Sequence, residues 1–574
     1  MNASRAIFEI FKGYKVKDIF GLPGETTLSL YRAWKDYPEI KYHMCRDERS
    51  SVFMADAYAK ASGRVGICEG PSVGCTHMIP GVAEAFQSCI PLICITSDVP
   101  LKYNTKNMLT SCDQTALFKS ITKDSYTVNK PEELPHLFRR AFRTATTGKP
   151  GPVHIRIPSD IFDGEVPDCE IYTQPRYANF PGCRNAAAKE DIMDAAEHIA
   201  AAERPVMICG QGVVHSGAWR EVQEIAEKQN MPMGSSINAK GAIPENHHLA
   251  LGVIGARGGR KWGNEMIMKA DLVLFVGSST DSASTDSWKI PDPRSGQTFI
   301  QIDASERELG NNYNALPLFG DARETLRALI TALKDIKTPN RRNWAAKVGE
   351  GRAVHEEKLQ ALIAKEGDNI HPLSLVRAIE KVVPDNTFFA VDPGISAVYS
   401  AGFMRLDKAG RRTAYNFSMG ALGYAIPAAI GARFGVPEDS PVIGLVGDGS
   451  FGFCAGELET SVRLGLKIIY VLFNNQAFGW IRGTEHVETG RKVEPWYSQF
   501  TDFSKVDYVK FAESLGLKSF RAEKISEFEK LLKLCLLEEG PCFIDVPVMT
   551  EDRQLPPVPG WEAANIARPD EMIY

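Results

Sequence analysis

The chain has 574 residues and a mass of 63.3 kDa, several times the roughly 100 to 200 residues of one domain, so its length predicts about three domains. A hydrophobic content of 44% and a charged content of 24% are typical of globular proteins and exclude a disordered chain. With 66 basic and 71 acidic residues the formal net charge is -5. No block of basic residues is present, which argues against nucleic acid as a partner.

The sequence also argues against a membrane protein. Its longest purely apolar run, Ile468–Phe473, is far shorter than the roughly 18 residues of a membrane-spanning helix. The first twenty residues carry scattered charges and lack the apolar core of a signal peptide, so we expect no cleaved leader. The twelve cysteines form no Cys-x-x-Cys pair. We therefore expect reduced, mostly buried thiols in a cytoplasmic protein rather than disulfides or a metal site.

In the first third, short β-rich runs alternate with amphipathic segments, a pattern typical of helices packed on parallel sheets. The predicted strands are Asp18–Gly21, Gly66–Glu69, Leu92–Thr96 and Val153–Pro158. Between them we predict helices around Leu28–Lys35, Ser50–Ala61 and Gly81–Phe86. The polar, proline-containing stretch from Asp160 to about Lys189 is predicted to be a linker.

The alternation continues through the rest of the chain. In the middle third a buried strand within 204–209 ends in glycines and leads to a helix with Val222, Ile225 and Ala226 on one face. Further predicted strands are Leu272–Val276, Phe299–Ile302, Thr387–Val391, Val442–Val446, Ile468–Phe473 and Phe543–Val546, and a charged helix is predicted at 341–365. The fold class is therefore α/β, with three domains at 1–165, 190–335 and 370–550, each a mainly parallel sheet flanked by helices, and a C-terminal arm at 551–574.

The most informative motif follows the strand Val442–Val446. Gly447, Asp448, Gly449 and Ser450 come where backbone N–H groups can cradle a phosphate at the start of a helix. A carboxylate beside a phosphate is repulsive unless a cation lies between them, so Asp448 indicates a divalent metal, with the oxygen of Asn475 as a second ligand. Taken alone, the motif favours a structural strand-to-helix turn.

The 27-residue spacing from Asp448 to the second asparagine of Asn474-Asn475 resembles the signature of thiamine-diphosphate-dependent enzymes, in the branch of acetolactate synthase, pyruvate oxidase and benzaldehyde lyase. The resemblance implies the thiamine-diphosphate-binding fold for the outer two domains and a Rossmann-like middle domain. It also implies that Mg²⁺, held by Asp448, Asn475 and the carbonyl of Ala477, binds the diphosphate of the cofactor.

The first third resembles the other half of such a cofactor site. Glu48 precedes Ala55-Asp56-Ala57-Tyr58 by seven residues, as in the family. The resemblance makes Glu48 the glutamate that hydrogen-bonds the aminopyrimidine ring and activates the cofactor. In the segment 420–429 it implies that the carbonyl of Gly420 accepts the cofactor's amino proton and that Leu422 supports its bent conformation. From the residues alone, Glu48 fits a solvated helix start and the segment 420–429 fits a buried helix.

Several positions depart from the family. Asp47 stands where the family has histidine, the Gly-Pro-Gly turn survives only in part as 70–74, and Leu109-Thr110-Ser111 replaces Phe-Gln-Glu. Acetolactate synthesis itself is therefore in question. The stretch 277–283 lacks the arginine of flavin-binding relatives, which argues against FAD. Arg257 lies near another flavin loop of the family and keeps that alternative open.

Substrate contacts are expected from residues around the reactive ring. The candidates are Pro23, Glu25, His77, Thr110, Ser396, Trp480, Ile481 and His486, with Ser396 also a cofactor contact. His77 and His486 are candidate proton relays, with a surface or packed histidine as the alternative. The C-terminal arm is either a lid over the site or a packed surface segment.

The resemblance implies cleavage or formation of a C–C bond in a 2-oxo acid or diketone, by a decarboxylase or carboligase. It further implies a homodimer or homotetramer, because in the family Glu48 and the diphosphate site of one active site belong to different subunits. Two alternatives remain open, a flavin-dependent 2-oxo acid oxidase and a non-catalytic homologue that binds the cofactor.

Overall fold

The computed structural model describes residues 1–364, 369–489, 496, 498–561 and 573. It divides into two compact units. Unit 1 comprises Met1–Cys183, Ser418–Val442 and Cys454–Ile468, and unit 2 comprises Arg184–Phe417, Ile443–Phe453 and Ile469–Tyr574. Within the described residues, no helix is both long enough and apolar enough to cross a membrane.

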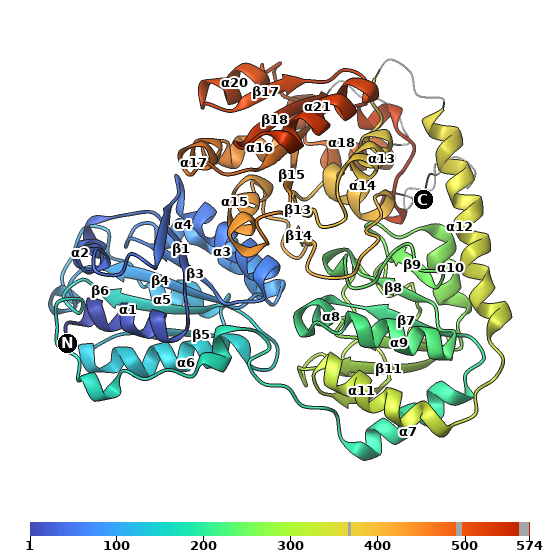
Figure 1. Cartoon of the computed structure of the whole chain (residues 1–574), viewed down its shortest axis with the longest axis horizontal. Coiled ribbons are helices and arrows are strands. Elements are labelled where there is room, and N and C mark those ends of the chain that lie inside the picture. Colours follow the sequence, from blue (N-terminus) through green and yellow to red (C-terminus); the bar gives the residue numbers. More distant parts are fainter. Residues whose placement is uncertain (365–368, 490–495, 497, 562–572, 574) are drawn as a thin grey trace. The chain divides into compact units, whose positions relative to one another are not determined.

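Unit 1 contains a sheet of six parallel strands in the order β2-β1-β3-β4-β6-β5. The strands are β1 (Asp18–Gly21), β2 (Lys41–Met44), β3 (Gly66–Gly70), β4 (Leu92–Asp98), β5 (Asp124–Thr127) and β6 (Val153–Pro158). One face packs on α1 (Ala3–Gly13), α2 (Leu28–Trp34) and α6 (Leu134–Thr146) through a shared apolar core, and α1 and α6 lie side by side (Figure 1). The remaining helices are α3 (Glu48–Ser62), α4 (Cys75–Gln87) and α5 (Gln114–Lys119).

Two helices from the last third also belong to unit 1, α15 (Ala425–Gly435) and α17 (Glu457–Arg463). Helix α15 packs closely along α3, since a Cβ on Gly431 would lie 1.9 Å from the Met54 carbonyl oxygen. A buried polar network joins the same helices. Lys60 Nζ lies 2.8 Å from Asp56 Oδ2 and donates to the Tyr424 hydroxyl at 3.1 Å. Because the Lys60 ammonium and the Asp56 carboxylate are both buried, loss of either one would leave the other as an uncompensated buried charge.

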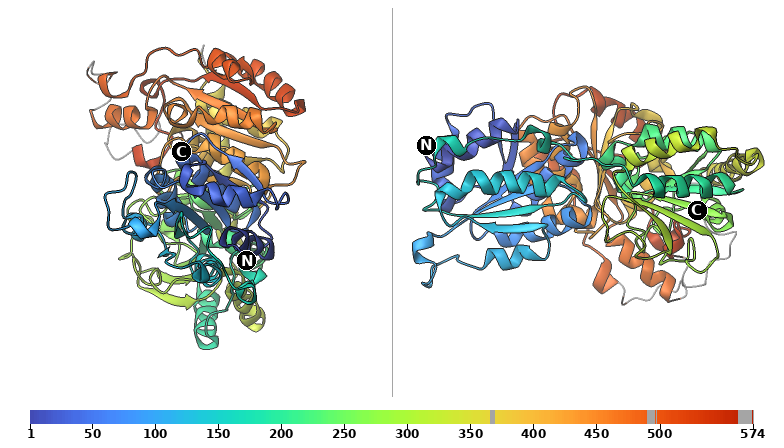
Figure 2. Two further views of the ribbon diagram at one scale, coloured as in Figure 1. Left: turned by 90° about the vertical axis from the view of Figure 1, so that its left-hand side faces the viewer. Right: turned by 90° about the horizontal axis from the view of Figure 1, so that it is seen from below.

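Unit 2 contains two further six-stranded parallel sheets, seen from other sides in Figure 2. The first has the order β12-β11-β10-β7-β8-β9. Its strands are β7 (Pro205–Cys209), β8 (Met233–Ser235), β9 (Ala250–Val253), β10 (Leu272–Val276), β11 (Thr298–Asp303) and β12 (Ala315–Phe319). Its helices are α7 (Lys189–Ala201), α8 (Gln211–Ser216), α9 (Trp219–Gln229), α10 (Lys261–Lys269), α11 (Ala322–Ala332) and α12 (Arg342–Ile363). This strand order is that of a Rossmann fold.

The second sheet of unit 2 has the order β14-β13-β15-β16-β18-β17. Its strand β15 begins at Val442, a residue that belongs to unit 1. Its strands are β13 (Phe388–Val391), β14 (Thr413–Tyr415), β15 (Val442–Gly447), β16 (Ile469–Asn474), β17 (Lys518–Arg521) and β18 (Cys542–Pro547). The associated helices are α13 (Pro372–Val382), α14 (Ile395–Phe403), α16 (Asp448–Cys454), α18 (Gly479–Glu488), α19 (Ser498–Thr501), α20 (Tyr508–Ser514) and α21 (Ile525–Leu537). Counted from its own first strand, this sheet repeats the strand order of the sheet in unit 1.

The predicted α/β class with three parallel sheets is confirmed, and the middle sheet is Rossmann-like. Of the 11 cysteines that the structure describes, eight are buried. The predicted linker 160–189 is wrong in part, because Ile161, Phe162, Val166 and Ala178 join the core of unit 1. Helix α4 begins at Cys75 rather than Gly81, and residues 420–424 precede α15 rather than lying in a helix. The domain limits 1–165, 190–335 and 370–550 stay predictions.

Candidate functional site

Two predicted metal ligands lie at the same edge of the last sheet. Strand β15 ends at Gly447 opposite Phe473 of the parallel strand β16, so Asp448 and Asn475 follow neighbouring strand ends. One carboxylate oxygen of Asp448 accepts the N–H of Gly449 at 2.8 Å, and the other accepts the N–H of Gln476. Ala477, whose carbonyl completes the predicted ligand set, is buried next to them.

The charge and donors at this edge suit a hard divalent cation. The Asp448 side chain is buried, and burial raises its pKa to about 7. A positive charge beside the carboxylate offsets the free-energy cost of burying its negative charge. The Asn475 amide nitrogen donates to Glu551, so its amide oxygen is directed away from Glu551. A carboxylate, an amide oxygen and a backbone carbonyl are the oxygen ligands that Mg²⁺ prefers, so the donor set fits the metal.

The surroundings of this edge also fit a phosphate group. A Cβ on Gly447 would meet no atom within 4 Å, so space is open beside the turn. Ser450 is buried in the first turn of α16, two residues after Asp448. Sequence reasoning missed Glu551, which lies outside the motif and contacts Asn475 from 76 residues away.

The structure brings together Glu48 and His77, two residues predicted separately. Glu48 is buried at the first position of α3, and Asp47 caps the helix by accepting the Arg49 N–H at 2.8 Å. A hydrogen bond of 3.0 Å joins His77 Nδ1 to Glu48 Oε2. The His77 side chain is 60% exposed and that of Glu48 only 8%, so the imidazole connects a buried carboxylate with solvent.

Glycine at position 74 makes room for the Glu48 carboxylate. A Cβ built on Gly74 would lie 2.3 Å from Glu48 Oε1, well inside van der Waals contact. The glycine therefore leaves Oε1 uncovered by a side chain at this position while Oε2 binds His77. Gly74 belongs to the segment 70–74, which matches the Gly-Pro-Gly turn of the family only in part. The sequence of this segment does not predict the contact between Gly74 and Glu48.

A second residue missed by sequence reasoning, Glu84 of α4, holds the backbone that precedes α15. Its carboxylate accepts the N–H groups of Met419 at 2.7 Å and Gly420 at 3.2 Å, and burial raises its pKa. Gly420 has a φ of 72°, which glycine adopts without strain. Leu422, half-buried, follows in the same segment. Glu84 thus fixes the backbone of the predicted cofactor contact Gly420.

Other predicted residues are less constrained. Thr110, with a φ of 67°, forms a hydrogen bond of 2.9 Å between its hydroxyl and that of Ser72. Pro23 and Glu25 are exposed beside β1. The buried Ser396 donates its hydroxyl to the Asp392 carbonyl at 3.1 Å. Glu48, His77, Gly420, Leu422 and Thr110 belong to unit 1, whereas Asp448, Asn475 and Ser396 belong to unit 2.

Helix α18 carries the remaining three predicted residues, and the C-terminal arm packs on it. Ile481 is 55% exposed, His486 is buried, and the Trp480 ring lies 5.2 Å from that of Trp561. A Cβ on Gly483 would meet the Trp561 ring at 2.4 Å. The arm from 551 to 561 is therefore seated against α18, whereas most of its remainder lies outside the described residues.

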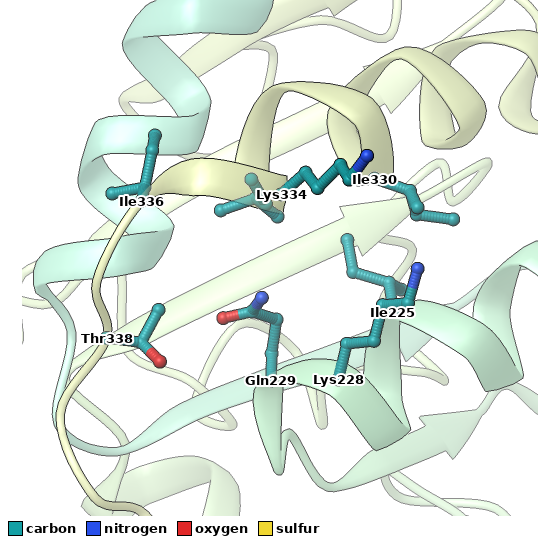
Figure 3. A pocket seen from close by; sticks show the side chains of 8 residues that line it. Ile225, Lys228, Gln229, Ile330, Lys334, Ile336 and Thr338 are labelled. Carbon is teal, nitrogen blue, oxygen red and sulfur yellow. The ribbon is translucent and has the colours of Figure 1, made fainter.

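A pocket of about 260 Å³ opens in the Rossmann-like part of unit 2, between α9 and the end of α11 (Figure 3). Its walls combine aliphatic and polar side chains, namely Ile225, Ile330, Leu333 and Ile336 with Lys228, Gln229, Lys334 and Thr338. None of the predicted site residues lines it. We therefore do not assign the pocket to the predicted chemistry.

The family models that match the chain cover most of its length. Three models of the thiamine pyrophosphate enzymes match, the N-terminal TPP binding domain at residues 1–117, the central domain at 192–329 and the C-terminal TPP binding domain at 392–546.

Individual relatives agree with these models. A probable acetolactate synthase large subunit of Methanocaldococcus jannaschii is 32% identical, covering 99% of this chain and 95% of the relative. The large subunit of acetolactate synthase isozyme 1 of Escherichia coli is 30% identical over 95% of this chain and 93% of its own. A probable 2-ketoarginine decarboxylase of Pseudomonas aeruginosa is 34% identical over 84% of this chain and 83% of its own. The three parallel sheets, the residues at the edge of the last sheet, the family models and the relatives all indicate the same family. The chain belongs to the thiamine pyrophosphate (thiamine diphosphate) enzymes, in the acetolactate-synthase-like branch of carboligases and decarboxylases.

Proposed function

We propose that this chain uses thiamine diphosphate and Mg²⁺ to cleave or form a C–C bond next to the carbonyl of a 2-oxo acid or diketone. The observation that carries the proposal is the edge of the last sheet, where Asp448 and Asn475 present oxygen ligands beside an open turn. The names of two relatives support the substrate class. One is a probable acetolactate synthase, and the other is a probable decarboxylase of 2-ketoarginine, which is a 2-oxo acid.

The residues at this edge would hold the cofactor's phosphate end. Asp448, Asn475 and the carbonyl of Ala477 would bind Mg²⁺, with Glu551 fixing the orientation of the Asn475 amide. The backbone of Gly447, Gly449 and Ser450 would bind phosphate oxygens. When bound, thiamine diphosphate supplies a nucleophilic carbon and takes up the electron pair released when the bond beside the carbonyl breaks.

Glu48 and its neighbours would serve the cofactor's pyrimidine end. Glu48 holds its carboxylate ready to share a proton with a ring nitrogen, because it is buried and anchored at the start of α3. His77 holds Glu48 Oε2 and can pass that proton to solvent, since most of its side chain is exposed. The Gly420 carbonyl, Leu422 and Ser396 complete the proposed cofactor contacts, and Glu84 positions the first of them.

The proposed substrate contacts are Pro23, His77, Thr110, Trp480, Ile481 and His486. We expect the chain to work as a homodimer or homotetramer, as its resemblance to the family implies. Light scattering of the purified chain in the presence of cofactor tests the oligomer directly, and a monomer with full activity would contradict it.

The decisive experiment replaces Glu48 by Gln in the full chain, reconstituted with thiamine diphosphate and Mg²⁺. The amide keeps the size of the side chain but cannot take up the proton, so turnover should fall at least ~10²-fold while Mg²⁺-dependent cofactor binding persists. Screening 2-oxo acids and diketones for decarboxylation and carboligation identifies the substrate for this assay. A Glu48→Gln variant with unchanged turnover would disprove the role of Glu48, and a wild-type chain that retains no cofactor would disprove the function.

A further inference from the structure

Among the described residues, no carboxylate forms an ion pair with Arg257, a cation next to the proposed active-site helix. It lies in the loop after β9, and its guanidinium carbon is 4.4 Å from the centre of the Trp480 ring. The side chain is half-buried, and burial lowers its pKa. Asp286 acts on this guanidinium through its charge, but within the part of the chain that the structure describes no carboxylate lies within 4.0 Å of it and no acceptor is hydrogen-bonded to it.

The position of Trp480 connects Arg257 to the metal edge. Trp480 is the second residue of α18, directly after Gly479, and a Cβ on Gly479 would lie 2.3 Å from the Asn475 amide nitrogen and 2.4 Å from Glu551 Oε1. The first turn of α18 is therefore packed against the proposed ligand Asn475. The guanidinium stacks on the ring one residue further along.

The C-terminal arm holds this arrangement together. The Gly560 N–H donates to the Ala256 carbonyl at 2.9 Å, and the Trp561 ring packs on Trp480 at 5.2 Å. The loop of Arg257, the start of α18 and the arm thus form one cluster within unit 2. Such packing holds a guanidinium in place at little cost in side-chain entropy when a ligand binds.

A half-buried guanidinium without an anion costs free energy that an incoming anion recovers, and carboxylates pair with it through two parallel hydrogen bonds. In a 2-oxo acid enzyme the anion at hand is a carboxylate. A fixed positive charge stabilises a carboxylate in its charged form, which opposes its loss as CO₂. Arg257 is therefore suited to an acid group that stays in the product.

We propose that Arg257 binds a substrate carboxylate that the reaction does not remove. Two sources carry this chemistry, the acid group of a 2-oxo acid that accepts the new C–C bond and the second acid group of a dicarboxylic donor. The inference rests on the proposed function, because it assigns the substrate class of the same site. It distinguishes this chain from an enzyme that only joins or cleaves uncharged carbonyl compounds.

The test compares matched substrates in the full chain reconstituted with thiamine diphosphate and Mg²⁺. For the acceptor, 2-oxobutyrate is compared with propanal; for the donor, 2-oxoglutarate is compared with 2-oxobutyrate. In Arg257→Met, the KM for the compound with the retained acid should rise ~10- to 100-fold relative to its partner in one of the two pairs, as expected for a lost charge-assisted hydrogen-bonded pair. The affected pair identifies the source. Arg257→Lys should restore part of the difference, because it returns the charge without the planar fork.

Arg140→Met is the matched control. The Arg140 guanidinium carbon also lies over an aromatic ring, 4.9 Å from the centre of Tyr126, but Arg140 pairs with Asp124 at 3.2 Å. This control should leave both KM ratios unchanged. Unchanged ratios in Arg257→Met as well, with turnover intact, would overturn the inference and leave the proposed function standing. Absence of turnover with every substrate in the wild-type chain would instead overturn the proposed function.

A binding measurement gives a readout that does not require turnover. Calorimetric titration of the cofactor-free chain with oxamate, an unreactive acid of 2-oxo acid shape, should show binding that Arg257→Met weakens at least ~10-fold and Arg140→Met does not. Equal oxamate affinity in all three chains would count against Arg257. A flavin recovered from the purified wild-type chain and lost from Arg257→Met would overturn the inference, because the guanidinium would then serve a flavin phosphate.

Discussion

Replacing Gly74 by Ala should disable the Glu48 carboxylate without unfolding the chain. Gly74 has φ -65° and ψ -19°, a right-handed conformation that alanine adopts without strain. The only expected effect is therefore steric. The added Cβ would lie 2.3 Å from Glu48 Oε1, whereas ordinary contact begins near 3.4 Å, so the carboxylate must move by about 1 Å.

The size of the effect follows from that displacement. A reacting group misplaced by about 1 Å can cost ~10²-fold in rate, so kcat should fall by about that factor. Stability should change little, because the displaced atoms are the end of a flexible side chain and alanine reduces the entropy of the unfolded chain. The melting temperature should therefore stay within a few degrees of wild type while turnover collapses.

The assay measures kcat, melting temperature and Mg²⁺-dependent cofactor binding for Gly74→Ala beside Gly349→Ala. Gly349 lies inside α12, where an added Cβ would meet no atom within 4 Å, so this control should keep full activity. In a Glu48→Gln background, Gly74→Ala should cost little more, because both changes act on one group. A folded Gly74→Ala enzyme with kcat within twofold of wild type would refute the placement of the Glu48 carboxylate in the chemistry.

Three further predictions concern buried charge. The fully buried Glu69 accepts hydrogen bonds from Tyr31 and Tyr42, and burial raises its pKa to about 7. Between its ordinary pKa and about 7 the native state binds more protons than the unfolded one, so stability falls as pH rises through this window. Glu69→Gln should remove up to about 3 kcal/mol of this pH-dependent loss in the free energy of unfolding, because the amide does not ionise. The melting temperature of the variant should therefore exceed that of wild type by more at pH 8 than at pH 5. An equal difference at the two pH values would contradict the prediction. Lys60→Met should lower the free energy of unfolding in urea by about 3 to 5 kcal/mol, because the buried Asp56 carboxylate loses its cation. The control Lys269→Met removes an exposed pair with Glu265 and should lower it by less than about 1 kcal/mol. Glu551→Ala should weaken Mg²⁺-dependent cofactor retention ~10- to 100-fold in equilibrium dialysis, because Asn475 loses the partner that orients its amide; unchanged retention would exclude that role.

The strands that sequence patterns predict best are the central ones. Strands β4, β7, β10 and β16 are buried along their whole length, and each contains a continuous run of at least four apolar residues. The missed strands are mostly at sheet edges, where one side faces solvent. Strand β17, for example, reads Lys-Ser-Phe-Arg and has no fully buried residue. Local pattern reveals an edge strand poorly because pairing with its neighbour, rather than its own apolar content, holds it in the sheet.

The same distinction separates the site residues that could be predicted from those that could not. Asp448 and Asn475 follow adjacent parallel strands, so a fixed spacing in the sequence predicts their proximity. Glu84 and Glu551 act through partners 335 and 76 residues away, Met419 and Asn475, and neither belongs to a local motif. Only the folded chain reveals that these two carboxylates position the backbone of Gly420 and the amide of Asn475.

Asp47 and His77, which the sequence presents separately, both lie next to Glu48 in the structure. Asp47 stands at the position where the family pattern predicts histidine, and it serves as the cap of α3. An imidazole nevertheless reaches the glutamate, since His77 comes from α4 and hydrogen-bonds Glu48 Oε2. The chain therefore has an imidazole beside the carboxylate, and this imidazole comes from a different helix. Because Gly74 opens the other carboxylate oxygen, His77 and the glycine together determine which face of Glu48 is available to a ligand.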